Sequence, residues 1–317
     1  MHVPKIFSAI AAAVLLFSAN VSAEPKALVF DEGIDWTEKT ITVKGEGFAP
    51  ADAVNRDHAA GLAFTAAKAD AYRKLGEIIN GVHVEGDKTV EGLITKQTVR
   101  TRVETTIKGA KVVGQDLLDE RNDKCAVYMQ VPLFGEENSL AGAVLERNTT
   151  LEPFPNPEFS TPSVPPLTRL SLQPTVKEFT DSPLTRKVET STSSPTKKSV
   201  KDYADKAQGD YTGLIVDCRG LGLKPVMSPV ILNTNGTKIY GHKNLDYEKV
   251  TVEGMADYVS DPDKVSRAGD KPLVVKAVKL ENFNSNPVLS IADSNRVLIE
   301  NHVTKFLKDL KVVFLTD

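Results

Sequence analysis

The residue with the greatest capacity for chemistry in this sequence is a cysteine between two charges. Asp217-Cys218-Arg219 ends an apolar run and precedes a glycine-containing turn. An adjacent arginine favours the nucleophilic thiolate, and His242 is a conceivable base. The alternation of the run, however, puts Cys218 on the same side as Leu214 and Val216, which predicts a buried, inert thiol. A core cysteine is the preferred interpretation, and an enzyme that uses Cys218 is the alternative.

The second cysteine follows the same rule. Cys125 alternates with the apolar Val127, Met129 and Val131, so it also belongs to the buried side of a strand. A disulfide between Cys125 and Cys218 would need an oxidising compartment and is the alternative to two free thiols. We predict two buried free cysteines that behave as small apolar side chains.

An acidic loop is the other place where the residue types suggest a ligand. Ser260-Asp261-Pro262-Asp263 is followed by Asp270, and such a loop could hold calcium. An EF-hand loop starting at Asp261 needs glycine at its sixth position and glutamate at its twelfth, but Ser266 and Pro272 stand there. The sequence therefore favours a solvated turn capped by its own side chains.

The remaining motifs add no catalytic pattern. No two of the five histidines stand at ligand spacing, and neither HExxH nor a paired CxxC occurs. There is no GxSxG and no Walker loop. Gly220-Leu221-Gly222 predicts a turn and not a dinucleotide site, because Leu223-Lys224-Pro225 would interrupt the helix that must follow. We predict no catalytic residue, no cofactor and no metal site.

The charge balance excludes two classes of partner. The chain has 317 residues, a formal net charge of −3 and 26% charged residues without large basic clusters. Binding to nucleic acid or to an anionic membrane surface needs clustered lysine and arginine, so neither is expected. After residue 23 no stretch approaches 18 consecutive apolar residues, so we expect no integral membrane span in the mature chain.

The first 23 residues have the order of a secretory signal peptide. His2 and Lys5 precede an apolar run from Ile6 to Phe17, and Val21-Ser22-Ala23 offers small residues for cleavage before Glu24. This predicts export to the periplasm or the outer envelope, and the enzyme alternative would then be periplasmic. No cysteine stands at the cleavage region, so lipid attachment there is not expected.

A change in composition predicts how the mature chain is divided. Residues 146–208 contain nine prolines, many serines and threonines and no glycine, without a period of 2 or 3.6. We predict a disordered linker here, between domains at 24–145 and 209–317. Its PFPNPEF piece, residues 153–159, is interpreted as plain spacer. The alternatives are that it drapes over a domain or serves as a docking peptide for a partner.

Periodicity predicts an α+β fold for both domains. In the first, a strand over 41–45 precedes a helix from about 51 or 57 to 79, which Asn80-Gly81 would end in a left-handed cap. A strand from 82, a second helix over 90–107 and a hairpin of 111–118 with 125–133 follow. The predicted buried stripe of the first helix has a spacing of three and four: Ala60, Phe64, Ala67, Ala71, Leu75 and Ile78.

The second domain is predicted to mix strands with segregated helices. Strands are expected at 213–219, 273–280, 288–291 and 312–315, with a helix capped by Asp293 or Ser294 before the last. The runs 230–232 and 237–240 flank Asn233-Thr234-Asn235-Gly236, and Asn-Gly between apolar runs is typical of a hairpin. This arrangement favours α+β over a doubly wound nucleotide fold.

Four ordered pieces of the first domain carry a resemblance to a known family. They are GEGFAP (45–50), TAAKADAYRKLGEIINGVHVEGDKTV (65–90), TRVETTIKGAKVV (101–113) and AVYMQVPL (126–133). With them, residues 45–134 resemble the bacterial family of the twenty-kilodalton outer-membrane lipoprotein, to which the N-terminal domain of flagellar assembly protein T is related. The segment from Tyr211 to Thr316 resembles a companion domain of envelope proteins. The resemblance implies an α+β envelope domain without catalytic residues, here without its lipid-accepting cysteine.

These observations together lead to one expected function. We expect an exported, non-enzymatic cell-envelope protein that acts through protein–protein contacts in assembling or supporting a surface or flagellar structure. Its partner is an envelope protein that the sequence does not identify, and a second copy of the chain is a further possibility. A cell-wall or glycan binder ranks lowest, because Trp36 is the only tryptophan for stacking a sugar.

Overall fold

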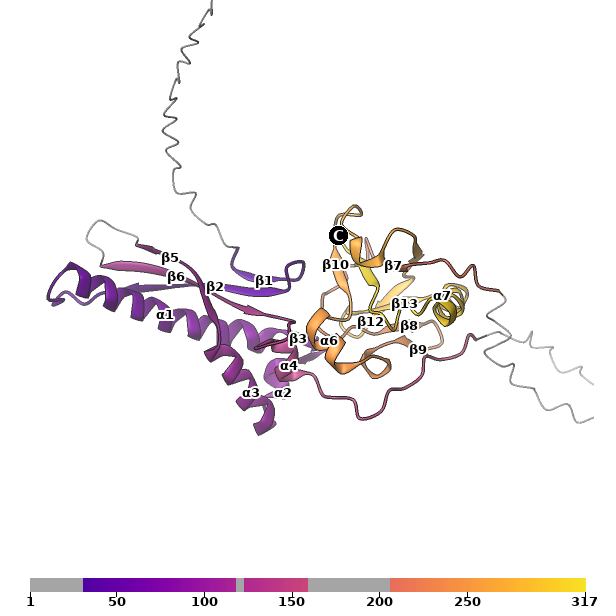
Figure 1. Ribbon diagram of the computed structural model, residues 1–317, viewed down its shortest axis with the longest axis horizontal. Helices are drawn as coiled ribbons and strands as arrows, with labels where there is room; N and C mark the ends of the chain where they lie inside the picture. Colours follow the sequence, from indigo (N-terminus) through magenta and orange to yellow (C-terminus); the bar gives the residue numbers. More distant parts are fainter. Residues whose placement is uncertain (1–30, 118–122, 159–205) are drawn as a thin grey trace, which may run out of the picture. The chain divides into compact units, whose positions relative to one another are not determined.

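The computed structural model describes residues 31–117, 123–158 and 206–317, which fall into one compact unit beginning at Asp31 (Figure 1). The predicted signal peptide, most of the predicted linker and the tip of the first hairpin lie outside the described residues. Helices and sheets occur on both sides of the 159–205 gap, so the α+β class is confirmed at that level. No helix in the described ranges has both the length and the apolar character needed to span a bilayer.

The N-terminal region, residues 31–158, is built on an antiparallel sheet with the order β1-β2-β6-β5. Val43 of β2 pairs with Met129 of β6 in the centre of this sheet, and both side chains are fully buried. The long helix α1 (Arg56–Gly81) lies along the sheet (Figure 1). The four strands are β1 (Gly33–Asp35), β2 (Thr40–Phe48), β5 (Lys111–Leu117) and β6 (Lys124–Pro132).

The helix lies close to β2 because the facing residues are small. Gly45 and Gly47 of β2 meet the backbone of α1: a Cβ built on Gly47 would lie 2.1 Å from the amide nitrogen of Ala67. A larger side chain at either of these two positions would push the helix away from the sheet. The buried stripe of α1 has a regular spacing of four: Ala59, Ala63, Ala67, Ala71, Leu75 and Ile79.

The sequence-based stripe was right in its middle and wrong at its ends. Ala67, Ala71 and Leu75 are buried as predicted, but Ala59, Ala63 and Ile79 are buried in place of Ala60, Phe64 and Ile78. The reason is that residues four apart drift by about 40° around the helix at each step, so this spacing follows a twisted sheet. The predicted stripe, with its mixed spacing of three and four, keeps to one side of the helix and therefore departs from the contact at both ends.

Two further expectations for this region were wrong. Asn80 and Gly81 do not adopt a left-handed cap; α1 continues through Gly81, and Val82 leaves in an extended conformation with its N–H bonded to the carbonyl of Ile79. The helix predicted over 90–107 is two helices, α2 (Val90–Leu93) and α3 (Gln97–Lys108). The strand predicted from residue 82 is β3 (His83–Glu85), whereas its hairpin partner β4 (Lys88–Thr89) and the short helix α4 (Leu140–Val144) were not predicted.

The C-terminal region, residues 206–317, contains a parallel sheet with the order β10-β14-β7-β11. Its central strand β7 is buried over Gly213–Val216, as parallel strands covered on both faces are. Parallel pairing was not expected from the sequence. The four strands are β7 (Gly213–Asp217), β10 (Asp257–Val259), β11 (Pro272–Lys276) and β14 (Val312–Leu315).

A second sheet of this region has the order β12-β13-β8-β9. Strands β8 (Ile231–Asn233) and β9 (Lys238–Tyr240) form the predicted Asn-Gly hairpin. The strand predicted over 273–280 is split into β11 and β12 (Lys279–Glu281), and β13 (Asn286–Leu289) begins two residues earlier than predicted.

The helices of the C-terminal region are short except for the last. They are η1 (His242–Asn244) and η2 (Ser266–Ala268), which are 3-10 turns, α6 (Tyr247–Glu253) and α7 (Ile291–Thr304). The cap of α7 is Ser290, whose hydroxyl accepts a hydrogen bond from the N–H of Asp293, so the prediction of a cap at Asp293 or Ser294 was wrong.

Residues of the N-terminal region contact residues of the C-terminal region. Their buried apolar side chains belong to one continuous cluster, and the ring of Trp36 lies edge-on to that of Tyr258 at 5.7 Å. The backbone N–H of Ser228 donates to the carbonyl of Val84 at 2.7 Å, which links β3 to the C-terminal region. These contacts are of the kind found inside a domain.

Candidate functional site

The start of the predicted linker lies in an ordered, extended course against the C-terminal region. The side-chain amide of Asn148 donates to the carbonyl of His242 at 2.8 Å. Farther along, the N–H of Glu152 donates to the carbonyl of Lys243 at 2.9 Å, and Asn244 donates from its amide to the carbonyl of Glu152 at 3.2 Å. The prediction of a disordered linker was therefore wrong for residues 146–158. For residues 153–158, the alternative of a segment draped over a domain describes what is observed.

We call residues 152–158 the docked segment. Prolines at 153, 155 and 157 alternate along it, and each fixes φ and lacks an N–H. The ring of Phe154, between two of them, packs against the apolar core. Because the prolines restrict the free segment, less conformational entropy is lost when it docks.

The end of the docked segment is held through its main chain. Asn295, on α7, accepts a hydrogen bond from the N–H of Glu158 at 2.7 Å and donates to the carbonyl of Glu158 at 2.6 Å. A single side chain thus satisfies both main-chain groups of one residue. Such a pair of bonds recognises extended backbone without regard to the side chain that it carries.

The side chain of Glu158 is held by a different set of groups. In the turn between β8 and β9, the amide of Asn233 donates to one carboxylate oxygen at 3.0 Å and the amide of Asn235 to the other at 2.7 Å, while the hydroxyl of Thr237 donates to the first. We call Asn233, Asn235, Thr237 and Asn295 the glutamate clamp. Hydrogen bonds from Thr237, Asn235 and Asn233, in that order of size, lower the pKa of Glu158.

The central member of the clamp is fixed before any ligand arrives. Asn233 is 2% exposed, and its side-chain oxygen accepts from the N–H groups of Asn235 at 3.0 Å and Thr237 at 2.9 Å. These two bonds identify which end of the amide is oxygen, so the nitrogen must point toward the carboxylate. The clamp is therefore preorganised by its own turn.

The docked segment also forms one wall of a cavity of about 640 Å³. Its lining is mixed in character and includes Val84, Lys88, Lys96, Pro153, Val230 and His242. The Nε2 atom of His242 is buried and has no hydrogen-bond partner in the described part of the chain, and burial lowers the pKa of this imidazole against the opposing effect of Glu85 and Glu146. A neutral imidazole therefore borders the cavity at neutral pH.

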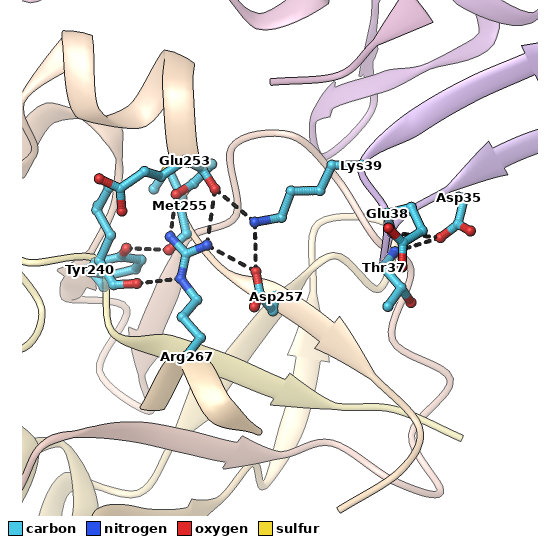
Figure 2. A network of polar contacts seen from close by, with 11 residues as sticks. Asp35, Thr37, Glu38, Lys39, Tyr240, Glu253, Met255, Asp257 and Arg267 are labelled. Atoms are coloured by element: carbon cyan, nitrogen blue, oxygen red, sulfur yellow. Dashed lines mark hydrogen bonds and ion pairs between the residues drawn. The ribbon is translucent and has the colours of Figure 1, made fainter. Parts of the chain in front are cut away.

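A separate polar network fastens Lys39 to the C-terminal region (Figure 2). The guanidinium of Arg267 donates to Asp257 at 2.9 Å and to the carbonyls of Glu253, Gly254 and Leu310. The ammonium of Lys39 lies 2.9 Å from the same carboxylate and donates to the carbonyl of Glu253 at 2.8 Å. Four of the five N–H groups of the guanidinium donate to protein groups, which indicates a structural role.

Cys218 is buried, as the preferred interpretation of the sequence predicted. Cys218 is a fully buried free thiol, and desolvation, with a smaller effect of Asp217, raises its pKa to about 12. Arg219 does not contact the sulfur; its guanidinium donates to Asp217 at 2.9 and 2.7 Å and lowers the pKa of that carboxyl to about 2. Cys125 is also a buried free thiol whose pKa is raised by burial.

The other two candidate motifs are turns, as predicted. Asp261 accepts a hydrogen bond from the N–H of Asp263 at 3.0 Å, and no group of three or more potential metal ligands occurs among the described residues. Gly220 and Gly222 both have positive φ, and their N–H groups donate to the carboxylate of Asp317 at 2.5 and 3.3 Å. The carboxylate closes the turn that follows β7.

The geometry defines a two-region α+β protein whose C-terminal region holds an extended proline-rich segment. A family model described as Treponema pallidum Tp0624, second domain, matches residues 213–317. This match covers less than half of the chain, so it is a similarity of the C-terminal region alone. No curated protein matches the sequence. The whole glutamate clamp falls inside the matched range, whereas the docked segment falls outside it.

Sequence reasoning missed the glutamate clamp. The Asn-Thr-Asn-Gly turn was interpreted for its backbone alone, and the segment for its composition alone. Two features could have pointed to the site: three alternating prolines followed directly by a glutamate, and a hairpin turn with more amide side chains than its geometry needs.

Proposed function

We propose that this protein is an exported, non-enzymatic protein of the bacterial cell envelope that acts through protein–protein contacts. The observation that carries the proposal is the grip on the docked segment, which is held at its main chain by Asn244 and Asn295 and at one carboxylate by the clamp. Paired main-chain contacts to an extended chain are a means of holding polypeptide.

Three further features support the proposal. The signal-peptide pattern of the first 23 residues favours export. The resemblance of residues 45–134 to the outer-membrane lipoprotein family, and to the N-terminal domain of flagellar assembly protein T, favours a place in the envelope and a role in assembling or supporting a surface or flagellar structure. The buried, high-pKa thiol of Cys218 weakens the enzyme alternative, because the thiolate is the nucleophile.

The test is photo-crosslinking in intact cells of the native host. A crosslinking residue in place of Lys243, which is exposed beside the docked segment, is compared with one in place of Arg73, an exposed residue of α1. We expect a discrete crosslinked product at position 243, containing an exported protein or a second copy of this chain, and mature protein that begins at Glu24. Absence of any crosslinked polypeptide at both positions, or a retained Met1, contradicts the proposal.

A further inference from the structure

The glutamate clamp has the properties of a site that exists apart from its present occupant. All four of its side chains belong to residues 233–295, within the range that matches a known family domain, and its ligand comes from outside that range. Asn233 is buried and held in orientation by the N–H groups of Asn235 and Thr237, which do not depend on Glu158. Without a carboxylate, three polar donors would face an empty position.

The donors select a carboxylate. Two amide N–H groups and one hydroxyl converge on the two oxygens of Glu158, and no lysine or arginine among the described residues makes a hydrogen bond or ion pair with it. Neutral donors can be matched to the two oxygens of a carboxylate, whereas an amide ligand would present an NH₂ group to the donating nitrogen of Asn235. A glutamine would fit only if the exposed amide of Asn235 turned its oxygen toward the ligand, so the site favours glutamate over glutamine.

The main-chain grip sets the length of the side chain. Because Asn295 fixes both the N–H and the carbonyl of residue 158, the Cα of that residue has one position relative to the turn that carries Asn233 and Asn235. An aspartate is one carbon–carbon bond shorter, about 1.5 Å, and its carboxylate would stop short of the donors. The clamp thus distinguishes glutamate from aspartate.

The rest of the docked segment extends the recognition upstream. Asn244 donates to the carbonyls of Glu152 and Pro153, and the ring of Phe154 packs against the core. Asn156, in contrast, is exposed and its identity is not recognised. The features that are recognised are therefore an aromatic residue, alternating prolines and a glutamate four residues after the aromatic one.

We propose that the glutamate clamp is a peptide-binding site for an extended Phe-Pro-x-Pro-Glu sequence, and that the docked segment is its resident intramolecular ligand, which such a sequence in a partner protein replaces. This inference rests on the proposed function and names the chemistry of the partner. Tethering gives the resident segment an effective concentration in the millimolar range, so a partner must compete with it. The resident segment therefore sets a threshold for binding.

The test uses the peptide Leu-Glu-Pro-Phe-Pro-Asn-Pro-Glu-Phe, labelled with a fluorophore, and full-length chains. In one chain, residues 152–158 are replaced by seven glycines and serines, which leaves the clamp in place and removes its resident ligand. We expect saturable binding to this chain at least tenfold tighter than to the wild type. Peptides with Gln or Asp in place of the residue that corresponds to Glu158 should bind at least tenfold more weakly.

A matched control tests the clamp itself. In the same background, Asn233→Asp retains the oxygen that accepts from the turn and replaces the donating nitrogen by a second oxygen, which repels a carboxylate. This variant should lose peptide binding while its circular dichroism is unchanged. Equal binding of the Glu, Gln and Asp peptides, or no binding by the clamp freed of its segment, overturns the inference and leaves the segment as a fixed structural element.

Two further points keep the result decisive. If the glycine–serine chain does not fold, the same titration is made on the variant Glu158→Gln, which retains every main-chain contact of the docked segment. The Glu peptide must again bind this variant at least tenfold more tightly than it binds the wild type. Equal binding to the variant and the wild type overturns the inference. The outcome is separate from that of the crosslinking in cells, because a protein that contacts partners elsewhere would still crosslink when its clamp binds no peptide in trans.

Discussion

Removal of the Arg267 side-chain charge tests how much a buried polar network stabilises the C-terminal region. The side chain is 11% exposed, and its guanidinium donates to Asp257 and to the carbonyls of Glu253, Gly254 and Leu310. Arg267→Met keeps much of the volume and removes every donor. The three carbonyls and one carboxylate oxygen then lose a partner that water replaces poorly at this depth.

The magnitude follows from that loss of partners. Deleting one member of a buried ion pair costs about 3 to 5 kcal/mol, because the other member stays buried. Asp257 retains Lys39 and is partly exposed, so we expect the lower end, about 3 kcal/mol. A chain of this size loses about 2 °C of Tm per kcal/mol, which predicts a decrease of about 6 °C.

The assay is thermal and urea unfolding followed by circular dichroism, and α1 supplies the control. Arg73 bonds Asp70 and Glu77 at 2.7 and 2.6 Å, but its side chain is 57% exposed. Since ion pairs in water contribute little, Arg73→Met should leave Tm unchanged within error. Equal losses in the two variants would refute the view that burial makes the Arg267 network strong.

The remaining predictions concern packing, titration and thiol reactivity. Gly47→Ala should destabilise the protein by about 1 to 3 kcal/mol, because the added methyl group would collide with the backbone of α1. Gly61→Ala places the methyl group in open space in the middle of α1 and should stabilise the protein by about 1 kcal/mol. Urea unfolding measures the sign of both changes in the free energy of unfolding. Because the pKa of Glu158 is lowered in the folded state, the contribution of its carboxylate to docking is present above the unfolded pKa of 4.5 and is lost as pH falls through the folded pKa. NMR titration of this carboxyl should give a midpoint below 4.5. A midpoint at 4.5 would contradict the hydrogen bonds of the glutamate clamp. Cys125 and Cys218 should both resist a thiol reagent at pH 8 in native protein and both react after unfolding without reductant, whereas rapid native labelling would contradict their burial.

The expectation of two domains joined by a disordered linker rested on composition alone. A proline-rich stretch without periodicity predicts a spacer, and for residues 146–158 this was wrong. Asn148 and Glu152 bind groups of the C-terminal region, and the apolar cores of the two regions are continuous. We therefore expect the two regions to unfold together, with limited proteolysis and calorimetry as the checks.

Features that depend on neighbours along the chain follow from the amino-acid sequence alone. The four-residue spacing from Ala67 to Leu75 sets the buried face of α1, because residues four apart share one side of a helix. The Asn-Gly pair sets the β8–β9 hairpin, and Cys125 is buried on the same side of β6 as Val127, Met129 and Val131. Each of these follows from backbone geometry over a few residues.

Contacts between residues far apart in the sequence are seen only in the folded structure. The bonds from the clamp to Glu158 span 75 to 79 residues in the turn and 137 residues to Asn295. The parallel pairing of β7 with β11 and β14 likewise joins strands far apart in the sequence. Neither periodicity nor composition encodes such pairings, because their free energy comes from donors and acceptors that become neighbours only once the chain has folded.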